Sequence, residues 1–388
     1  MINAFINPKL LHWAIERSGV SPESLTKRMN IKPEKMALWK QGDDKPTFPQ
    51  AQKLARVLHI PFGYLFLSLP PTEKLLLPDL RTLKDDIFKS PTPDFLDLLN
   101  DVLSKLDWYR EYLQEQNCIP LKFVGRFSAA SNAEEVAKDI VSVLGLDRSL
   151  REKVRTWEEF LRTMISIAQE KGILVMRSGI VGNDTHRQLD VNEFRGFAIS
   201  DEMAPLIFIN GSDAKAAQIF TLAHELAHIW IGASGISNLD ISQPSTRQTR
   251  KVELFCNQVA AEMLVPKNSF LKAWRNEISI DDNLHNLARY YRVSSLVVLR
   301  RAVDLGRIDK EQYYDLYHDE LERFKGYRRV GGKTGGDFYA SLFLRNSGAL
   351  TSALVSSVRE GKILYREASR MLGVKVKTLQ EISTRLGM

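Results

Sequence analysis

The chain has 388 residues, of which 44% are hydrophobic and 26% are charged, as in ordinary globular proteins. Its length predicts two or three domains. No segment approaches the roughly 18 apolar residues that a membrane helix needs, and the start lacks the pattern of a signal peptide. The only cysteines, Cys118 and Cys256, are far apart, which fits a reducing compartment. We therefore expect a cytoplasmic protein that does not contact a membrane.

The net charge of +7 is unevenly distributed along the chain. Residues 1–60 carry a net charge of +5 and residues 321–388 carry +8, which leaves −6 on the middle. This pattern indicates that contacts with a polyanion, if the protein makes any, involve the two ends.

The first 60 residues predict short amphipathic helices joined by tight turns, over residues 8–19, 22–29, 34–41 and 47–59. Such spacing is typical of a helix-turn-helix bundle in which the helix over residues 33–41 enters the major groove of DNA. The lysines placed for phosphate contacts are Lys32, Lys35, Lys40 and Lys45.

This segment resembles the phage-repressor (Cro/C1, or XRE-type) helix-turn-helix domain. The resemblance rests on Trp39, Gly42, Pro46, Thr47 and Leu54. Two positions depart from that family, since Thr26 stands where it usually has Ala and Lys40 where it has Glu. The departures leave the five-helix bundle intact but weaken the prediction of DNA binding, because many such bundles bind only proteins.

Residues 71–90 read as a connector that begins at Pro70-Pro71. Helices are expected over residues 91–116, 134–144 and 154–171. Short apolar runs at residues 173–176, 196–200 and 205–209 then predict strands of a small sheet. We expect Leu206–Asn210 to be an edge strand that pairs with a substrate backbone, and Ser212 or Asp213 to cap the helix that follows.

The segment Thr221–Trp230 contains the pattern His-Glu-x-x-His at His224, Glu225 and His228. Residues four apart lie on one face of a helix, so both imidazoles can reach one metal ion. Glu225 can reach water at that metal and act as general base. The alternative is a core helix with two histidines satisfied by hydrogen bonds.

A catalytic zinc site needs a third protein ligand. The extended pattern that adds a third His is absent, because Ile231 and Ser234 stand where it needs Gly and His. The other class uses a Glu on a later helix, and Glu253 lies 25 residues beyond His228. Asn257, one turn later, is placed to orient a His ring. Cys256 is a competing ligand, although its helical phase differs from that of Glu253.

These motifs, with the Ala-Ala-Glu-Met-Leu-Val-Pro266 run after Asn257, resemble the ImmA/IrrE family of metallopeptidases. The resemblance implies a gluzincin-like zinc endopeptidase that cleaves repressor-type helix-turn-helix proteins. By match, His224, His228 and Glu253 become ligands of Zn²⁺ and Glu225 the catalytic base.

The expected fold is α+β and mostly helical. Its predicted parts are a helix-turn-helix bundle (1–70), the connector (71–90), a gluzincin-like peptidase domain with a small sheet and the His-Glu-x-x-His helix (91–275), a helix-turn-helix-like extension (276–330) and a C-terminal helical module (331–388). We expect a mobile polar loop over residues 237–250, a Gly-rich linker over residues 331–336, and helices over residues 338–359 and 367–382. The last helices predict either a second basic helix-turn-helix or a protein-docking bundle.

The predicted function is a cytoplasmic zinc endopeptidase that regulates transcription, a stress response or a mobile element by cleaving a partner. The expected partners are an HTH repressor or a toxin–antitoxin protein, DNA through residues 1–70, and a second copy of the chain. Two alternatives stay open. One is a DNA-binding regulator or antitoxin-like protein whose peptidase fold is a docking body, and the other is self-cleavage in the connector over residues 70–79.

Overall fold

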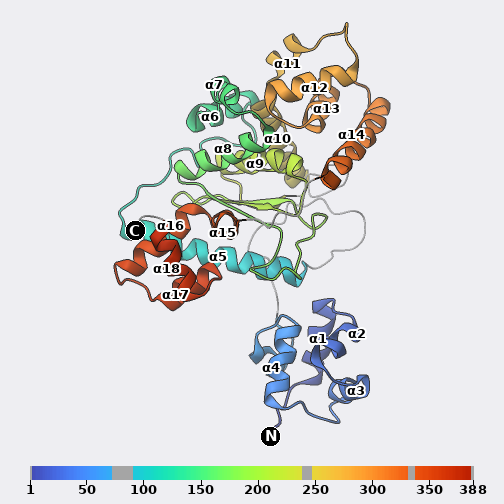
Figure 1. Ribbon diagram of the computed structural model, residues 1–388, viewed down its shortest axis with the longest axis vertical. Coiled ribbons are helices and arrows are strands. Elements are labelled where there is room, and N and C mark those ends of the chain that lie inside the picture. Colours follow the sequence, from blue (N-terminus) through green and yellow to red (C-terminus); the bar gives the residue numbers. More distant parts are fainter. Residues whose placement is uncertain (1, 72–90, 238–246, 331–336, 386–388) are drawn as a thin grey trace. The chain divides into compact units, whose positions relative to one another are not determined.

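The computed structural model describes residues 2–71, 91–237, 247–330 and 337–385 (Figure 1). The fold is α+β and mostly helical, as predicted, with one four-stranded sheet among the described residues. It divides into two compact units, and the division falls after Asp97. Among the described helices, none is both long and apolar enough to cross a membrane.

The first unit is a bundle of short helices. They are α1 (Pro8–Ser18), α2 (Pro22–Met29), α3 (Pro33–Gln41), α4 (Phe48–Val57) and the 3-10 helix η1 (Phe62–Phe66). The sequence sets their ends, because prolines occupy the first turns and residues such as Gly19 and Gly42 close helices in the left-handed conformation. The fifth helix of the predicted bundle is thus a 3-10 turn. Trp39 and Leu54 are fully buried in the core of this bundle.

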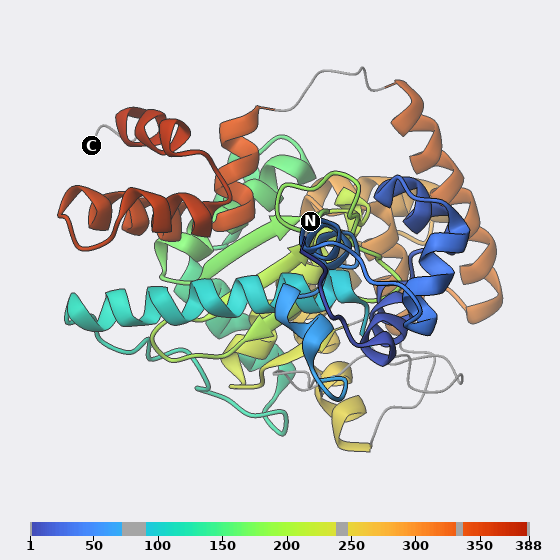
Figure 2. The same ribbon diagram turned by 90° about the horizontal axis from the view of Figure 1, so that it is seen from below.

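The second unit is built around the sheet. Its strands are β1 (Leu174–Ser178), β2 (Gly196–Ile199), β3 (Leu206–Asn210) and β4 (Gly235–Ser237), in the order β1-β3-β2-β4. Strands β1 and β3 are parallel, whereas β2 is antiparallel to both of its neighbours. Helices α8 (Trp157–Glu170) and α9 (Lys215–Trp230) pack on one face. Helix α5 (Pro93–Glu115) crosses the other face (Figure 2).

The prediction that Leu206–Asn210 is an edge strand is wrong. Strand β3 lies between β1 and β2, and all five of its residues are buried. Its uninterrupted apolar run is the pattern of a strand covered on both faces, and this pattern does not distinguish an interior strand from an edge strand such as β1. The sheet edge nearest to β2 belongs instead to β4, a three-residue strand that the sequence did not predict.

The other helices of this part of the second unit are α6 (Ala133–Leu144), α7 (Arg148–Lys153), α10 (Arg247–Leu264), α11 (Lys267–Ala273), α12 (Ile280–Tyr291), α13 (Ser295–Asp304) and α14 (Lys310–Val330). Helix α7 was not predicted, because its six residues are too few for a helical period. The predicted loop over residues 237–250 is wrong at both ends, since β4 includes Ser237 and α10 already begins at Arg247. Residues 238–246 lie outside the described residues.

The C-terminal module consists of α15 (Phe338–Asn346), α16 (Gly348–Arg359), α17 (Tyr365–Leu372) and α18 (Val376–Arg385). The predicted continuous helix over residues 338–359 is broken at Ser347, which has a φ of 62°. The carbonyl oxygen of the Gln169 side chain accepts hydrogen bonds from the Ser347 hydroxyl and the Gly348 amide, which stabilises the break. The predicted linker over residues 331–336 lies outside the described residues.

A buried lysine connects this module to the sheet's α5 layer. The Lys105 ammonium donates to Asp101 at 2.6 Å and to the Asn346 side-chain oxygen at 2.9 Å. Burial lowers the pKa of Lys105, although Asp101 opposes that effect. Loss of these bonds would leave the buried ammonium of Lys105 without a partner, which is costly. The bond to Asn346, the last residue of α15, therefore holds the end of α15 against α5.

Candidate active site

Helix α9 carries the His-Glu-x-x-His pattern through the centre of the second unit. It packs against β2 and β3 on one side and against α6, α8 and α10 on others, so every residue from Thr221 to Trp230 is buried. The predicted cap is wrong, because the N-cap is Ala214 and no side chain caps the helix. Packing on all sides, rather than capping, therefore holds this helix.

Three side chains from α9 and α10 converge in the buried interior. His224 Nε2 lies 3.2 Å from Glu253 Oε2, and His228 Nε2 lies 3.2 Å from Glu253 Oε1. The two imidazole Nε2 atoms are 3.1 Å apart. Both histidines are fully buried and Glu253 is 6% exposed. The structure thus brings together the three residues that the sequence selected as metal ligands.

The spacing of these atoms fits a divalent metal. Ligands about 2.1 Å from a tetrahedral zinc are roughly 3.4 Å from one another, close to the three separations observed here. Two neutral imidazoles and one carboxylate are also a donor set that zinc accepts. The three residues would therefore hold the ion on one side and leave the opposite side open to a water or a substrate.

The charges in this triad are balanced by protons when no metal is bound. Burial disfavours a charged imidazole, but the Glu253 carboxylate outweighs it and raises the pKa of His224. Burial and the neighbouring His224 lower the pKa of His228. Burial alone would raise the pKa of Glu253, yet the two histidines lower it to about 2. The raised pKa of His224 and the lowered pKa of Glu253 both favour the charged pair in the absence of a metal.

Metal binding is expected to release a proton from His224. A raised pKa keeps this imidazole protonated to a higher pH than an ordinary histidine, and it ligates only when neutral. Affinity should therefore rise with pH while His224 is protonated, and the number of protons released per zinc should be greater than zero. Calorimetric titration of zinc in two buffers of different ionisation enthalpy measures that number, and proton uptake would contradict it.

Asn257 lies one turn after Glu253 and supports the first histidine. Its side-chain oxygen is 3.0 Å from His224 Nδ1, and the two groups form a hydrogen bond. A donor proton on Nδ1 leaves the lone pair of Nε2 directed to the metal position. The contact therefore selects the tautomer of His224 that can bind a metal.

Glu225 is fully buried beside the triad, and Gly196 of β2 makes room for it. A Cβ on Gly196 would lie 2.9 Å from Glu225 Oε1 and 2.7 Å from Thr221 Cγ2. No side chain fits there unless α9 moves away from the sheet. Sequence reasoning missed Gly196, because its role depends on an approach between segments 25 or more residues apart.

Cys256 is not part of the ligand group. The thiol is fully buried, and burial raises its pKa well above the usual value, so it stays protonated. A metal-binding cysteine must be a thiolate. Among the described residues, the group that includes α9 ligands contains only His224, His228 and Glu253.

The end of α9 is anchored to α6. The Trp230 indole donates to Asp139 Oδ2 at 2.8 Å, and Arg126 donates to Asp139 Oδ1 at 2.7 Å. The Trp230 ring also stacks on Phe123, with centroids 4.5 Å apart. These contacts fix the helix two residues after His228 and thereby limit movement of the histidine pair.

A second group of potential metal ligands, Asp281, His285 and Glu320, lies on α12 and α14. His285 Nδ1 is 3.6 Å from Asp281 and its Nε2 is 3.8 Å from Glu320. The Arg323 guanidinium donates to both carboxylates, at 2.7 and 2.8 Å. The guanidinium of Arg323 therefore already bonds to both carboxylates that a metal ion would need.

The four lysines predicted to contact DNA are not equally displayed on the first unit. Lys32 and Lys45 are exposed, whereas Lys35 and Lys40 are half-buried. Lys35 Nζ lies 5.8 Å from the centre of the Trp39 ring, and Lys45 Nζ lies 4.0 Å from that of Phe5. Cation–π contacts of this kind are weak at the surface. Their role in DNA binding stays a prediction.

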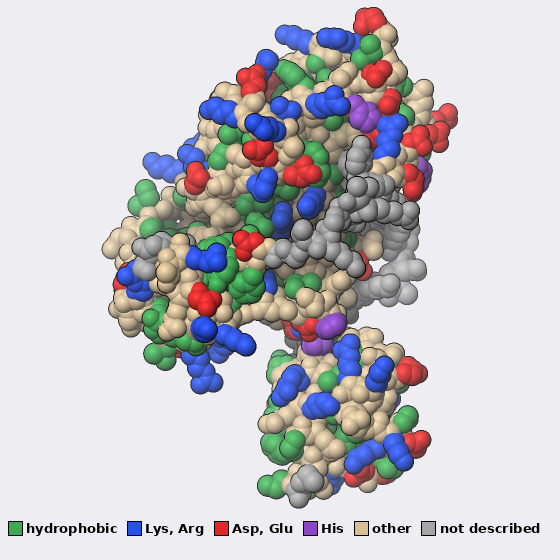
Figure 3. All heavy atoms as spheres, in the orientation of Figure 1, with side chains coloured by type: hydrophobic (Ala, Val, Ile, Leu, Met, Phe, Trp, Pro, Cys, Tyr) green, Lys and Arg blue, Asp and Glu red, His purple; other side chains and the backbone are tan. Residues whose placement is uncertain are grey.

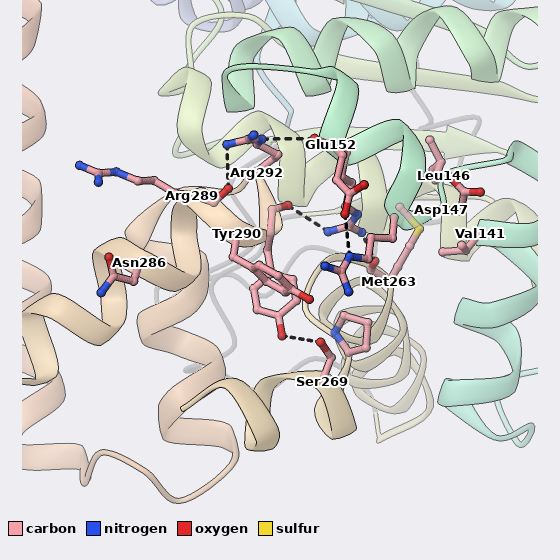
Figure 4. Close-up of a pocket in the computed structure, with 14 residues that line it drawn as sticks. Val141, Leu146, Asp147, Glu152, Met263, Ser269, Asn286, Arg289, Tyr290 and Arg292 are labelled. Carbon is pink, nitrogen blue, oxygen red and sulfur yellow. Dashed lines mark hydrogen bonds and ion pairs between the residues drawn. The ribbon is translucent and has the colours of Figure 1, made fainter. Parts of the chain in front are cut away.

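A cavity of about 560 Å³ opens between α7, α10 and α12, away from the triad residues (Figure 4). Arg151 lines this cavity and donates to the carbonyl oxygens of Met263, Leu264 and Tyr291, at 2.7 to 2.9 Å. Burial lowers the pKa of Arg151 to about 10, so it remains charged at neutral pH. Arg151 thus closes the C-terminal end of α10, the helix that carries Glu253.

Replacing Arg151 with Ala is expected to lower the stability of the second unit. Three buried carbonyl oxygens would lose a charged donor, at a cost of about 3 kcal/mol. Thermal unfolding followed by circular dichroism should show a fall in Tm of about 6–10 °C. Arg148→Ala is the matched control, because Arg148 is 74% exposed and makes only surface contacts, an ion pair with Glu152 and a cation–π contact with Tyr290, among the described residues. Equal shifts for both variants would contradict the role of Arg151.

Two histidines and a glutamate around one position, beside a carboxylate on the same helix, define a metallopeptidase-like site. The comparison with protein families agrees. Residues 168–303 match the family model Peptidase_M78, described as the IrrE N-terminal-like domain. The matched range contains the four strands, α9 and α10, and thus the whole triad.

A second family model matches the C-terminal module. Residues 346–385 match a domain of unknown function (DUF8813), a range that covers α16, α17 and α18. A comparison with curated proteins gives no match. The family matches therefore support a metallopeptidase-like domain and leave the C-terminal module to be interpreted from its structure.

Proposed function

We propose that the protein is a zinc-dependent endopeptidase that cleaves a protein partner. The observation that carries the proposal is the buried convergence of His224, His228 and Glu253, with Glu225 on the same helix. A bound zinc ion would lower the pKa of water and polarise a carbonyl group. Glu225 would accept the proton of the attacking water and pass it to the leaving amine.

The substrate backbone would pair with the sheet edge formed by β4. Gly196, whose Cα faces Glu225, is paired with Ser237 of β4 in the antiparallel register. An extended peptide added beside β4 would therefore run past the catalytic carboxylate. Substrates with N-methylated amides next to the scissile bond should be cut poorly, and equal cleavage of methylated and unmodified peptides would exclude this pairing.

The proposed partner is a regulatory protein of the helix-turn-helix class. The support for it is the resemblance to ImmA/IrrE peptidases and the bundle over residues 1–70, which resembles the DNA-binding domain of repressors. Within this proposal the first unit binds DNA, and the protein acts in the cytoplasm on transcription, a stress response or a toxin–antitoxin pair.

Cleavage of a peptide library tests the peptidase proposal without a known partner. The purified full-length protein is incubated with zinc and peptides derived from a bacterial proteome, and products are identified by mass spectrometry. We expect new termini that disappear with a chelator and return with added zinc. Absence of metal-dependent products, also from purified helix-turn-helix repressors, would contradict the proposal.

A further inference from the structure

The C-terminal module contains a tight pair of helices, α17 and α18. Only three residues, Gly373 to Lys375, separate them, and Gly373 has a φ of 66°. Leu372 and Leu379 are buried between the helices, and α16 packs against both. A three-residue turn with Gly at its start and a third supporting helix is the geometry of a helix-turn-helix.

The body of the second unit holds this turn in place. Asn183 donates a hydrogen bond to the carbonyl oxygen of Gly373, and Asn346 donates to that of Leu372 at 3.2 Å. A Cβ on Gly373 would lie 3.0 Å from Asn183 Nδ2. The turn between α17 and α18 is therefore held by Asn183 and Asn346, which lie outside the pair.

The outer surface of the pair is basic. Residues 359–385 contain seven Lys or Arg and three Glu. Lys and Arg side chains are prominent over α17 and α18, at the lower left of Figure 3. Exposed cations without an acidic partner among the described residues are Arg366, Arg370, Lys375 and Lys377.

The three glutamates do not neutralise these four cations. Glu367 accepts from the Leu364 amide, where it caps α17, and Glu381 accepts from the Tyr339 hydroxyl. Glu360 pairs with Lys362. A net positive field therefore remains around the start of α18, as required for attraction to a polyanion.

The exposed side chains at the start of α18 are types that read base edges. Val376 is 42% exposed, and Lys377 and Gln380 are exposed beside it. An apolar side chain contacts the thymine methyl group, lysine contacts guanine, and glutamine pairs with adenine in the major groove. Tyr365, at the start of α17, is 46% exposed and can donate to a phosphate.

The other two helix pairs of this kind in the described chain present different surfaces. The exposed residues of α3 include Glu34, Ala37 and Leu38, none of them basic. In α13, Arg300 and Asp304 are exposed and form an ion pair, whereas Arg301 is buried and bonded to Glu262. One exposed lysine, Lys32, directly precedes α3, whereas α18 has two exposed lysines at its start, Lys375 and Lys377.

We propose that α16–α18 is a DNA-binding helix-turn-helix in which α18 enters the major groove of duplex DNA. Arg366, Lys375 and Lys377 contact phosphates or guanine, and Val376 and Gln380 read bases. Duplex DNA fits better than duplex RNA, because the RNA major groove is too narrow for a helix. This site is separate from the peptidase proposal and from residues 1–70, so each can fail alone.

The test measures binding of the full-length protein to a fluorescent 30-base-pair duplex of random sequence by anisotropy, over a range of salt concentrations. Lys375→Ala/Lys377→Ala should weaken binding about tenfold or more at 0.1 M salt and reduce the salt slope by about 2, because each lysine releases about one counterion. Binding equal to that of the unchanged protein would overturn the proposal.

Two control variants separate this surface from general charge and from the first unit. Lys153→Ala/Lys171→Ala removes two exposed lysines elsewhere in the second unit and should leave affinity nearly unchanged. Lys32→Ala/Lys45→Ala removes two of the exposed lysines of the first unit. The loss caused by Lys375→Ala/Lys377→Ala should persist in the Lys32→Ala/Lys45→Ala background, and its disappearance there would overturn the proposal. An equal loss in Lys153→Ala/Lys171→Ala, or no binding of the duplex by the unchanged protein, would also overturn it. Unchanged circular dichroism and Tm confirm that each variant is folded.

Discussion

Glu225→Gln is expected to abolish peptide cleavage while zinc binding is retained. The amide has nearly the shape of the carboxylate but cannot accept the proton of the attacking water. General-base catalysis contributes about 10²–10⁴ in rate, so kcat should fall by at least that factor, or about 3–5 kcal/mol. Glu253, the other carboxylate of the site among the described residues, does not replace it, because it is held by the two histidines.

The measurement is turnover of one cleaved peptide together with the zinc content of both proteins. Equal zinc content with lost turnover assigns the defect to chemistry rather than to metal loss. Cleavage by Glu225→Gln at the rate of the unchanged protein would exclude Glu225 as the base. A contaminating peptidase is recognised in the same way, since it cleaves equally in both preparations.

Glu253→Ala is expected to cause the largest loss of metal affinity. It removes one of three ligands and also the carboxylate that balances the charge of the histidines. The loss should exceed the roughly 10–100-fold effect of changes around a metal site. Competition with a zinc-binding dye measures it. Because His224 loses its acidic partner, its pKa should also fall in the metal-free protein.

Gln258→Ala is the matched control on the same helix, because Gln258 is exposed and lies outside the triad. It should bind zinc like the unchanged protein. If Glu253→Ala keeps full zinc occupancy, another residue completes the site. Cys256→Ser then tests the thiol, which the structure places outside the ligand group.

Several features of the protein follow from the sequence alone, because they depend on local geometry. His224 and His228 are four residues apart on a helix, so their shared face needs no tertiary information. Proline and glycine at helix ends predicted most of the first unit, since their backbone preferences act within one turn. Glu253 was found from ligand chemistry, because a catalytic zinc site needs a third donor and that residue is at a suitable separation.

Tertiary structure decided what depends on segments far apart in the chain. The apolar run Leu206–Asn210 predicts a strand, but only pairing on both sides shows that it is interior and that β4 forms the edge. In the sequence, Gly196 is an ordinary residue of a predicted strand. Only the tertiary structure shows that Glu225 lies so close to it that a side chain would not fit. Likewise, the three helix pairs that look alike in sequence differ in the number of exposed basic side chains at the start of their second helix. That difference lies in which side chains packing leaves outside, and no local pattern determines that.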